Sequence, residues 1–415
     1  MELTTLRVCS RRAYSRTSKA LRAALDISAP RFVGMTEDQE AYFDVAKNFS
    51  ANELAPFADE WDAEKHFPKE TLRAAAALGF GGLYVGDDVG GSGLSRQDGL
   101  PIIEALAGGC TSTTAYLTIH NMVAGLVDVF GNDEQRQRLL PQLCTMEHMA
   151  SYCLTEPGAG SDAANLSTRA KLSADGESYV LTGEKAFISG GGTSDIYMVM
   201  ARTGDGGASG ISCFIVEAAD AVAKGTLSFG ANEKKLGWNS QPTAAVVLDE
   251  VVVPASNRIA AEGDGFKIAM KGLDGGRLSI GCCSTGAAQT CFDKARAYVG
   301  GREQFGAPLS VNQSVQFKLA EMATSLTTSR LLLRHAAGAL DEKRPEAREL
   351  CAMAKKQSTD AGFAVCNEAL QLHGGYGYLR DYEIERFLRD VRVHQILEGT
   401  NEIMSVIIGR ELTRA

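Results

Sequence analysis

The sequence lacks the features that mark membrane-spanning, metal-binding and nucleic-acid-binding proteins. It contains no run of about 18 apolar residues, the length that a membrane-spanning helix needs. Its ten cysteines form no C-x-x-C pair and no Cys/His group with zinc-site spacing, so we expect reduced, mostly buried thiols and no metal. The formal net charge is −9, and no basic block follows the N-terminal segment. This charge distribution argues against a nucleic-acid backbone as the main partner.

Nucleotide-binding fingerprints are also missing. The G-x-G-x-x-G motif is incomplete, because Gly158-Ala159-Gly160 continues to Ala163 and Gly91-Ser92-Gly93 continues to Arg96. Neither a P-loop nor a G-x-S-x-G elbow is present. A Rossmann dehydrogenase is therefore not expected. If the chain carries out redox chemistry, a flavin held tightly between domains remains as its cofactor.

The first thirty residues differ from the rest in charge. They are rich in Ser and Thr, contain Glu2 and Asp26 as the acidic residues, and include the basic residues Arg7, Arg11, Arg12, Arg16, Lys19 and Arg22. This composition predicts a mitochondrial transit peptide over residues 1–30 and a location in the matrix, with a basic tail of other purpose as the alternative. The stretch Arg12-Ala13-Tyr14-Ser15 also resembles a matrix-processing pattern.

The remaining chain divides into three parts by its periodicity. Residues 31–150 are predicted to be mostly helical. Thr36 is a candidate N-cap there, and Gln39 completes a capping box. Residues 151–255 contain short β-branched segments between glycine clusters, which predict a small β-barrel or sandwich. Residues 256–415 return to helices and predict a bundle. The apolar stripes that support the two helical parts are Tyr42, Val45, Phe49, Leu54 and Phe57, and Val315, Leu319, Met322 and Leu326.

Two stretches carry residues suited to catalysis or binding. "YCLTEPGAGSD", residues 152–162, combines a turn of small residues with hydroxyl groups, which suits a polar turn or a phosphate cradle. In "HQILEGTNEI", residues 394–403, Glu398 follows Ile396 and Leu397 and precedes Gly399. The pattern by itself fits either a solvated helix residue or a catalytic base at the mouth of an apolar pocket.

Both stretches resemble signatures of the acyl-CoA dehydrogenase family, the second over residues 371–403. The segments "AFISG", "GGR" at 275–277 and "REQFGAPLSVNQSVQ" fall between them in the family's order, and the resemblance covers residues 36–410. It implies an α+β multidomain fold: an N-terminal α-helical domain, a middle β-barrel and a C-terminal four-helix bundle. It also implies FAD-dependent α,β-dehydrogenation of an acyl-CoA, with electrons passed to electron-transferring flavoprotein.

The resemblance assigns catalytic and binding roles to residues of this chain. Glu398 would be the base that removes the α-proton, and the thioester oxygen would lie between the Glu398 backbone N–H and the flavin ribityl 2′-OH. Some members carry the base before the Arg of the "GGR" segment, where this chain has Gly276. Around the flavin the implied residues are Tyr152, Leu154, Thr155, Gly160, Ser161, Phe187, Ile188, Ser189, Thr400, Asn401 and Glu402. For the FAD pyrophosphate and adenosine, across a subunit boundary, they are Arg302, Gln304, Phe305, Gln313, Gln371, Gly374 and Gly375. For the acyl-CoA they are Ser161, Asp274, Gly275, Gly276, Arg277 and Arg410.

Assembly and substrate follow from the same resemblance. An active site completed by a neighbouring subunit implies a homotetramer. Leu397 stands where several straight-chain relatives have Tyr, and its smaller side chain fits a short branched substrate such as isobutyryl-CoA, whose product in valine breakdown is methacrylyl-CoA. The alternatives are 2-methylbutyryl-CoA or a short straight-chain substrate, an acyl-CoA oxidase, and an inactive scaffold. The C-terminal "RELTRA" lacks the peroxisomal Ser-Lys-Leu, and an intact Glu398 argues against a scaffold.

Overall fold

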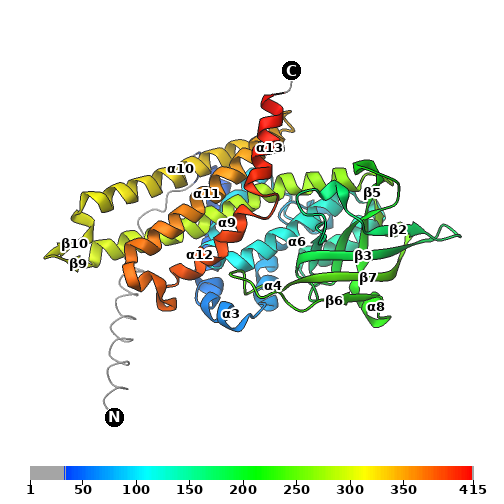
Figure 1. The fold of residues 1–415 in the computed structure, drawn as a ribbon, viewed down its shortest axis with the longest axis horizontal. Coiled ribbons are helices and arrows are strands. Elements are labelled where there is room, and N and C mark those ends of the chain that lie inside the picture. The colour runs from blue at the N-terminus through cyan, green and yellow to red at the C-terminus, as the bar shows by residue number, and fades with distance from the viewer. Residues whose placement is uncertain (1–31, 33, 414–415) are drawn as a thin grey trace, which may run out of the picture.

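The computed structural model describes residue 32 and residues 34–413, which fold into three parts in the predicted order (Figure 1). Helices come first, a mixed sheet follows, and a second set of helices completes the chain. The predicted transit peptide lies outside the described residues. No helix of the described segment combines the length and the apolar composition that a membrane crossing requires.

The first helix begins where the capping pattern predicts. Thr36 Oγ1 accepts from the backbone N–H of Gln39, and Gln39 Oε1 accepts from the backbone N–H of Thr36, both at 3.2 Å. This reciprocal pair satisfies two donors that the helix start would otherwise leave free. The helices of the N-terminal part are α2 (Glu37–Phe49), the π-helical turn η1 (Ser50–Leu54), α3 (Ala58–Glu64), α4 (Lys69–Ala77), α5 (Arg96–Ala107), α6 (Thr111–Phe130) and α7 (Asp133–Cys144).

The apolar stripe predicted for the first helix is partly wrong. Phe49 and Leu54 are buried, but Val45 and Phe57 are exposed. Val45 lies before the π-helical turn Ser50–Leu54 and is exposed because the buried face of α2 runs through Phe43, Ala46 and Phe49 instead. The π-helical turn then places the buried Leu54 five residues after Phe49.

The middle part is an eight-stranded mixed sheet with the strand order β6-β7-β3-β2-β4-β5-β8, and β1 pairs in parallel with β4. Its elements are β1 (Ala150–Cys153), β2 (Arg169–Leu172), β3 (Ser178–Ser189), β4 (Ile196–Arg202), β5 (Ile211–Glu217), α8 (Ala218–Ala223), β6 (Leu227–Phe229), β7 (Thr243–Pro254) and β8 (Arg258–Ile259).

The central strand β4 is buried on both faces. Met198 and Met200 belong to a core shared with α6 and α7, whereas Tyr197 and Val199 belong to a core made by the sheet strands, which also contains Leu181. Successive side chains of a strand point to opposite faces, so one strand contributes to two cores. The sheet thus wraps a core of its own, as expected for a small barrel or sandwich.

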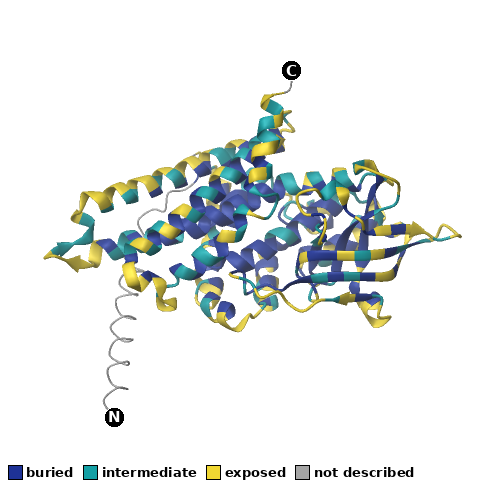
Figure 2. Ribbon diagram, viewed as in Figure 1, coloured by how far each residue is buried: buried dark blue, intermediate teal, exposed yellow. Residues whose placement is uncertain are grey.

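The C-terminal part is a bundle of long helices. Its elements are α9 (Gly265–Gly301), β9 (Glu303–Gln304), β10 (Ala307–Pro308), α10 (Gln313–Asp341), α11 (Ala347–His373), α12 (Ile384–Arg392) and α13 (Asn401–Leu412). α11 ends at the predicted glycine pair, where Gly374 has a φ of 59°. Figure 2 shows the buried centre of the bundle and the exposed outer side of α10.

The N-terminal helices join the bundle to the sheet. One core combines residues of α2 and α5 with residues of α9, α10 and α11, and a second combines α6 and α7 with the sheet and the start of α9. The nine cysteines among the described residues are all buried and free, which confirms the sequence-based prediction for them.

A buried ion pair anchors the turn that follows β1. Lys185 Nζ lies 2.8 Å from Glu156 Oε1 and donates to the backbone oxygen of Leu154 at 3.2 Å. Glu156 also accepts from the backbone N–H groups of Ser167 and Thr168. Burial works to raise the pKa of Glu156, but Lys185 and these donors lower it to about 2. The carboxylate is therefore held ionised inside the protein.

We expect Lys185→Met to destabilise this part of the fold, because it leaves a buried carboxylate without a counter-charge. Loss of one partner of a buried pair costs about 3–5 kcal/mol of unfolding free energy. The measurement is the shift in the unfolding midpoint, and Lys171→Met, at an exposed position on β2, is the matched control. Because Glu156→Gln removes the orphaned charge, a double variant with Lys185→Met should be more stable than Lys185→Met alone. A less stable double variant would contradict the assignment.

Candidate active site

Glu398 lies in a turn whose backbone conformation is strained. Residues 396–400 connect the one-turn helix η10 (Val393–Gln395) to α13. Glu398 has a φ of 58° and Gly399 a φ of 86°, so two successive residues are left-handed. Residues with a side chain rarely adopt this conformation, and where they do, the surrounding structure fixes it, often at a functional site. The turn therefore holds the Glu398 side chain in one direction.

The Glu398 carboxylate packs against α9 where a glycine leaves space for it. A Cβ on Gly276 would lie 2.6 Å from Oε2 of Glu398 and 2.5 Å from Cε of Met122, too close for any real contact. Among the described residues, Oε2 of Glu398 is buried and has no hydrogen-bond partner. In some members of the family that the sequence resembles, the base stands at the position of Gly276. In this chain that position faces the Glu398 carboxylate.

The environment of Glu398 suits a proton acceptor. Burial raises its pKa to about 7, and the positive charges of Arg277 and Lys355 oppose that rise. Arg277 is fixed in turn, because its Nε donates to the backbone oxygen of Glu398 at 3.3 Å and its Nη1 pairs with Oδ1 of Asp274 at 2.7 Å. A carboxylate whose pKa lies near the working pH is an effective general base.

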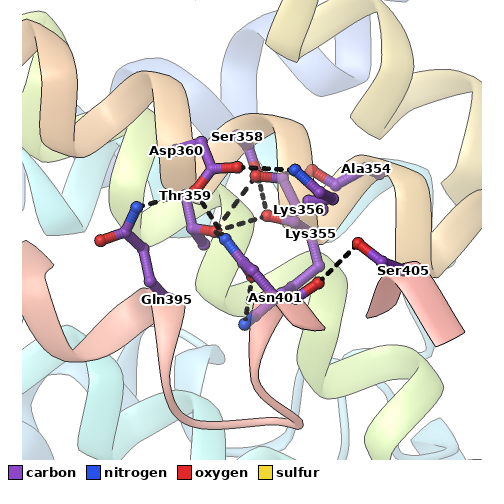
Figure 3. A network of polar contacts seen from close by, with 9 residues as sticks. All are labelled: Ala354, Lys355, Lys356, Ser358, Thr359, Asp360, Gln395, Asn401 and Ser405. Atoms are coloured by element: carbon purple, nitrogen blue, oxygen red, sulfur yellow. Dashed lines mark hydrogen bonds and ion pairs between the residues drawn. The ribbon is translucent and has the colours of Figure 1, made fainter. Parts of the chain in front are cut away.

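The residues after the turn have different surroundings from one another. Thr400 caps α13 by accepting from the backbone N–H of Ile403. Asn401 is buried, and its amide bonds to Lys355 and Asp360 rather than facing outward (Figure 3). Glu402 is exposed, and its pKa is lowered by hydrogen bonds from its own backbone N–H and from Thr400. Glu402 therefore lacks the burial that raises the pKa of Glu398.

The start of the first signature lies close to Glu398. Burial raises the pKa of Tyr152 well above its ordinary value, and the negative charge of Glu398 raises it further. The Tyr152 hydroxyl donates to the backbone oxygen of Ala269 on α9 at 3.4 Å. β1 and α9 thereby bring residues from two distant parts of the sequence to one place.

The turn that follows β1 has an open surface. Leu154 is buried below it, whereas Gly160 and Ser161 are exposed. A Cβ on Gly158 would meet no atom within 4 Å, and one on Gly160 would meet a single Thr155 atom at 4.0 Å. Another molecule can therefore approach this backbone closely.

Phe187 projects from a bulge at the end of β3. The pairing of β3 with β7 shifts register between Lys185 and Ile188, and Phe187 has a φ of 59°. The bulge leaves the Phe187 ring 67% exposed while Ile188 is buried and Ser189 half-buried. The backbone N–H of Ala186 donates to the Thr155 oxygen, which places the bulge beside the open turn. An exposed aromatic ring next to such a turn fits a flat aromatic cofactor.

The residues predicted to bind the far end of FAD form a second group. The strands β9 and β10 lie at the end of the bundle remote from the sheet (Figure 1). Arg302 is exposed there, with its guanidinium 5.8 Å from the Tyr376 ring centroid. Residues 371–375 are adjacent in the chain to Tyr376. The exposed members of this group are Arg302, Gln304, Phe305, Gln313, Gln371, Gly374 and Gly375.

The predicted acyl-CoA residues lie mostly on α9. Asp274, Gly275, Gly276 and Arg277 are consecutive on this helix, and a Cβ on Gly275 would lie 2.6 Å from Nη1 of Arg96. Arg410 is exposed near the end of α13, away from this run in the sequence.

Sequence reasoning missed three residues at the site. Met122 on α6 approaches Gly276 from the same side as the Glu398 carboxylate, and Arg96 on α5 approaches Gly275. Lys355 donates to the backbone oxygen of Gly399 at 2.8 Å. For Lys355 the sequence did contain a signal of burial. It lies on the same face of its helix as apolar and small residues, and a helix turns such a face toward the protein interior.

Comparison with known proteins agrees with this geometry. Three parts of the chain match the acyl-CoA dehydrogenase family: its N-terminal domain over residues 36–147, its middle domain over residues 151–251 and its C-terminal domain over residues 263–413.

Individual relatives match nearly the whole chain. The mitochondrial isobutyryl-CoA dehydrogenase of Bos taurus is 58% identical over 382 residues, which cover 92% of this chain and 90% of the relative. That of Dictyostelium discoideum is 54% identical over 385 residues, covering 92% and 91%. The solved structure of butyryl-CoA dehydrogenase from Megasphaera elsdenii has a TM-score of 0.88 at 35% identity and covers 92% of this chain and 99% of that one. The chain that carries Glu398 against Gly276 belongs to the acyl-CoA dehydrogenase family.

Proposed function

We propose that this protein catalyses the FAD-dependent α,β-dehydrogenation of a short branched acyl-CoA, with isobutyryl-CoA as its substrate and methacrylyl-CoA as the product. The observation that carries the proposal is the buried Glu398 carboxylate, which has an unpaired oxygen and a pKa of about 7. The two isobutyryl-CoA dehydrogenases that resemble most of the chain support this choice of substrate.

Glu398 would remove the proton from the carbon next to the thioester carbonyl. That proton is weakly acidic, so the reaction needs both an aimed base and donors that stabilise the charge developing on the thioester oxygen. The strained turn aims the carboxylate, and the backbone N–H of Glu398 is the proposed donor to the oxygen. Arg277, bonded to the Glu398 backbone oxygen, keeps this segment in place.

The open turn and the bulge would hold the flavin. Phe187 supplies an exposed ring, Ser189 follows it, and Gly160 and Ser161 offer backbone and hydroxyl groups on the adjoining turn. FAD, when bound, supplies the acceptor for the hydride that leaves the β-carbon. The protein would exclude water from the site, because the apolar side chains of Met122 and Leu397 lie near Glu398.

Leu397 is the residue that we connect with the branched substrate. It is half-buried and packs against the main core at the junction of the N-terminal helices and the bundle. A branched aliphatic side chain takes less space than the Tyr of several straight-chain relatives. The room left beside Glu398 suits an α-methyl group.

We also propose that the enzyme is a homotetramer of the mitochondrial matrix that passes its electrons to electron-transferring flavoprotein. The group around Arg302 lies at the end of the bundle remote from the sheet, whereas Phe187 belongs to β3 of that sheet, so the group would act on the cofactor of a neighbouring subunit. Phe305, Val311 and Phe317 are exposed apolar side chains in the same region, which suits contact with another copy. The mitochondrial relatives and the basic residues 1–30 support the location.

The substrate assignment is tested by anaerobic flavin reduction. We expect isobutyryl-CoA to bleach the flavin of the purified protein faster than 2-methylbutyryl-, isovaleryl-, butyryl- or octanoyl-CoA at equal concentration. Faster reduction by butyryl- or octanoyl-CoA would replace the branched substrate with a straight-chain one. A protein that binds FAD and reacts with none of these thioesters would be a scaffold rather than a dehydrogenase.

Glu398→Gln should retain FAD and lose turnover, because the amide keeps the shape of the side chain but cannot accept the proton. A positioned general base contributes roughly 10²–10⁴-fold to the rate. The measurement is the rate of substrate-driven bleaching, with Glu321→Gln, exposed on α10, as the matched control. If Glu398→Gln reduced its flavin at the wild-type rate, another residue would be the base.

Arg302→Ala should lower FAD occupancy and weaken the oligomer together. The guanidinium is suited to bind a pyrophosphate of the neighbouring subunit with two hydrogen bonds, and alanine has no donor to replace it. The checks are the ratio of flavin to protein absorbance and the mass in solution, with Arg344→Ala, between α10 and α11, as the control. Full occupancy in a stable monomeric Arg302→Ala protein would contradict the subunit-crossing role.

A further inference from the structure

Lys355 on α11 is a completely buried lysine whose hydrogen-bond acceptors are neutral. Its Nζ donates to the backbone oxygen of Gly399 and to Oδ1 of Asn401, each at 2.8 Å (Figure 3). Lysine is almost never fully buried unless its charge is paired, because removing an ammonium from water is costly. The residues around Lys355 must therefore offset the cost of burying its charge.

The negative charge that acts on Lys355 most strongly is that of Glu398. In the part of the chain that the structure describes, no carboxylate oxygen lies within ion-pair distance of its Nζ. Burial lowers the pKa of Lys355 to about 8, opposed first by the charge of Glu398, while Arg277 lowers it further and Asp360 and Glu402 raise it. The ammonium thus faces the catalytic carboxylate across the turn rather than forming a direct pair with it.

Two successive turns of α11 hold the catalytic turn on both sides. Ahead of Glu398, the side chain of Gln395 donates to Oδ1 of Asp360 at 2.7 Å. Beyond it, Asn401 Nδ2 donates to the same Asp360 oxygen at 2.7 Å, and Lys355 holds the Gly399 oxygen. Figure 3 shows the contacts of Gln395 and Asn401 converging on one stretch of α11. The strained segment between Gln395 and Asn401 has little freedom to relax.

We propose that Lys355 is a positioning residue for the dehydrogenation: its ammonium fixes the Gly399 oxygen and the Asn401 amide so that Glu398 points at the substrate, and its charge favours the carboxylate form of Glu398. The inference rests on the proposed function and adds a residue to it. The other charged or titratable groups that face Glu398 are Arg277 on α9 and Tyr152 on β1. Lys355 contributes the cation from the α11 side.

Lys355→Met tests both parts of this role in the FAD-loaded oligomer. The methionine fills similar space without charge or donors. Loss of the cation makes the carboxylate less favourable, so the rising limb of flavin reduction by isobutyryl-CoA should move to higher pH by roughly 1 unit. Loss of the backbone contact should slow reduction at high pH by about 10²-fold, because small misplacement of a catalytic group is costly. The rate is followed anaerobically as a function of pH.

A second readout does not depend on turnover. The protonation of Glu398 can be titrated by infrared difference spectroscopy, taking as its signal the carboxyl band that disappears in Glu398→Gln. That band should titrate at higher pH in Lys355→Met than in the wild type. Lys318→Met, the same change at a half-exposed position of α10 that is paired with Glu368, should leave the midpoint in place.

The outcomes separate this inference from the function on which it rests. Wild-type flavin that no acyl-CoA reduces would refute the proposed function. Wild-type flavin that isobutyryl-CoA reduces, together with an unchanged rate and midpoint in Lys355→Met, would overturn the role of Lys355 alone. If Lys355→Met fails to fold, Lys355→Arg keeps the charge but moves the donors, so its rate should fall while its infrared midpoint shifts less than 1 unit. A wild-type rate in Lys355→Arg would also overturn the positioning role.

Discussion

The proposed active site depends on one close approach, that of the Glu398 turn to α9 at Gly276. The carboxylate occupies space that any side chain at 276 would fill, and it reaches that space only because Glu398 and Gly399 both adopt left-handed backbone conformations. Such a backbone is stable only when its neighbours hold it. Arg277 from α9 and Lys355 from α11 do this by binding the backbone oxygens of the two strained residues. Strain, burial and the raised pKa of Glu398 are thus consequences of one packing contact.

This contact also explains why the chain needs three parts. α9 begins beside the sheet, where the Ala269 oxygen accepts from Tyr152 of β1, carries Gly276 two turns later, and extends toward β9 and β10 at its other end. The N-terminal helices pack against both the bundle and the sheet, and Met122 of α6 approaches Gly276 beside the carboxylate. No single part contains the whole site.

The sequence predicted the order of the parts and the catalytic candidate, and it failed where tertiary contacts decide. The capping box at Thr36 and the glycine stop after α11 are local signals, and both are confirmed. The stripe through Val45 is wrong because the buried face of α2 runs through Phe43, Ala46 and Phe49 and leaves Val45 outside it. The helical face of Lys355 indicated that it is buried, but its hydrogen-bond partners lie 44 and 46 residues further along the chain, so no local pattern could assign it to the site. The roles of the FAD and acyl-CoA residues came from resemblance and remain predictions.

The space shared by Gly276 and Glu398 restricts which substitutions this chain can accept at two positions far apart in its sequence. A side chain at 276 would begin with a Cβ 2.6 Å from Oε2 of Glu398, so an acid cannot be added there while the Glu398 carboxylate keeps its place. Moving the acid onto α9 therefore requires two coordinated changes, one that removes the carboxylate at 398 and one that introduces a side chain at 276.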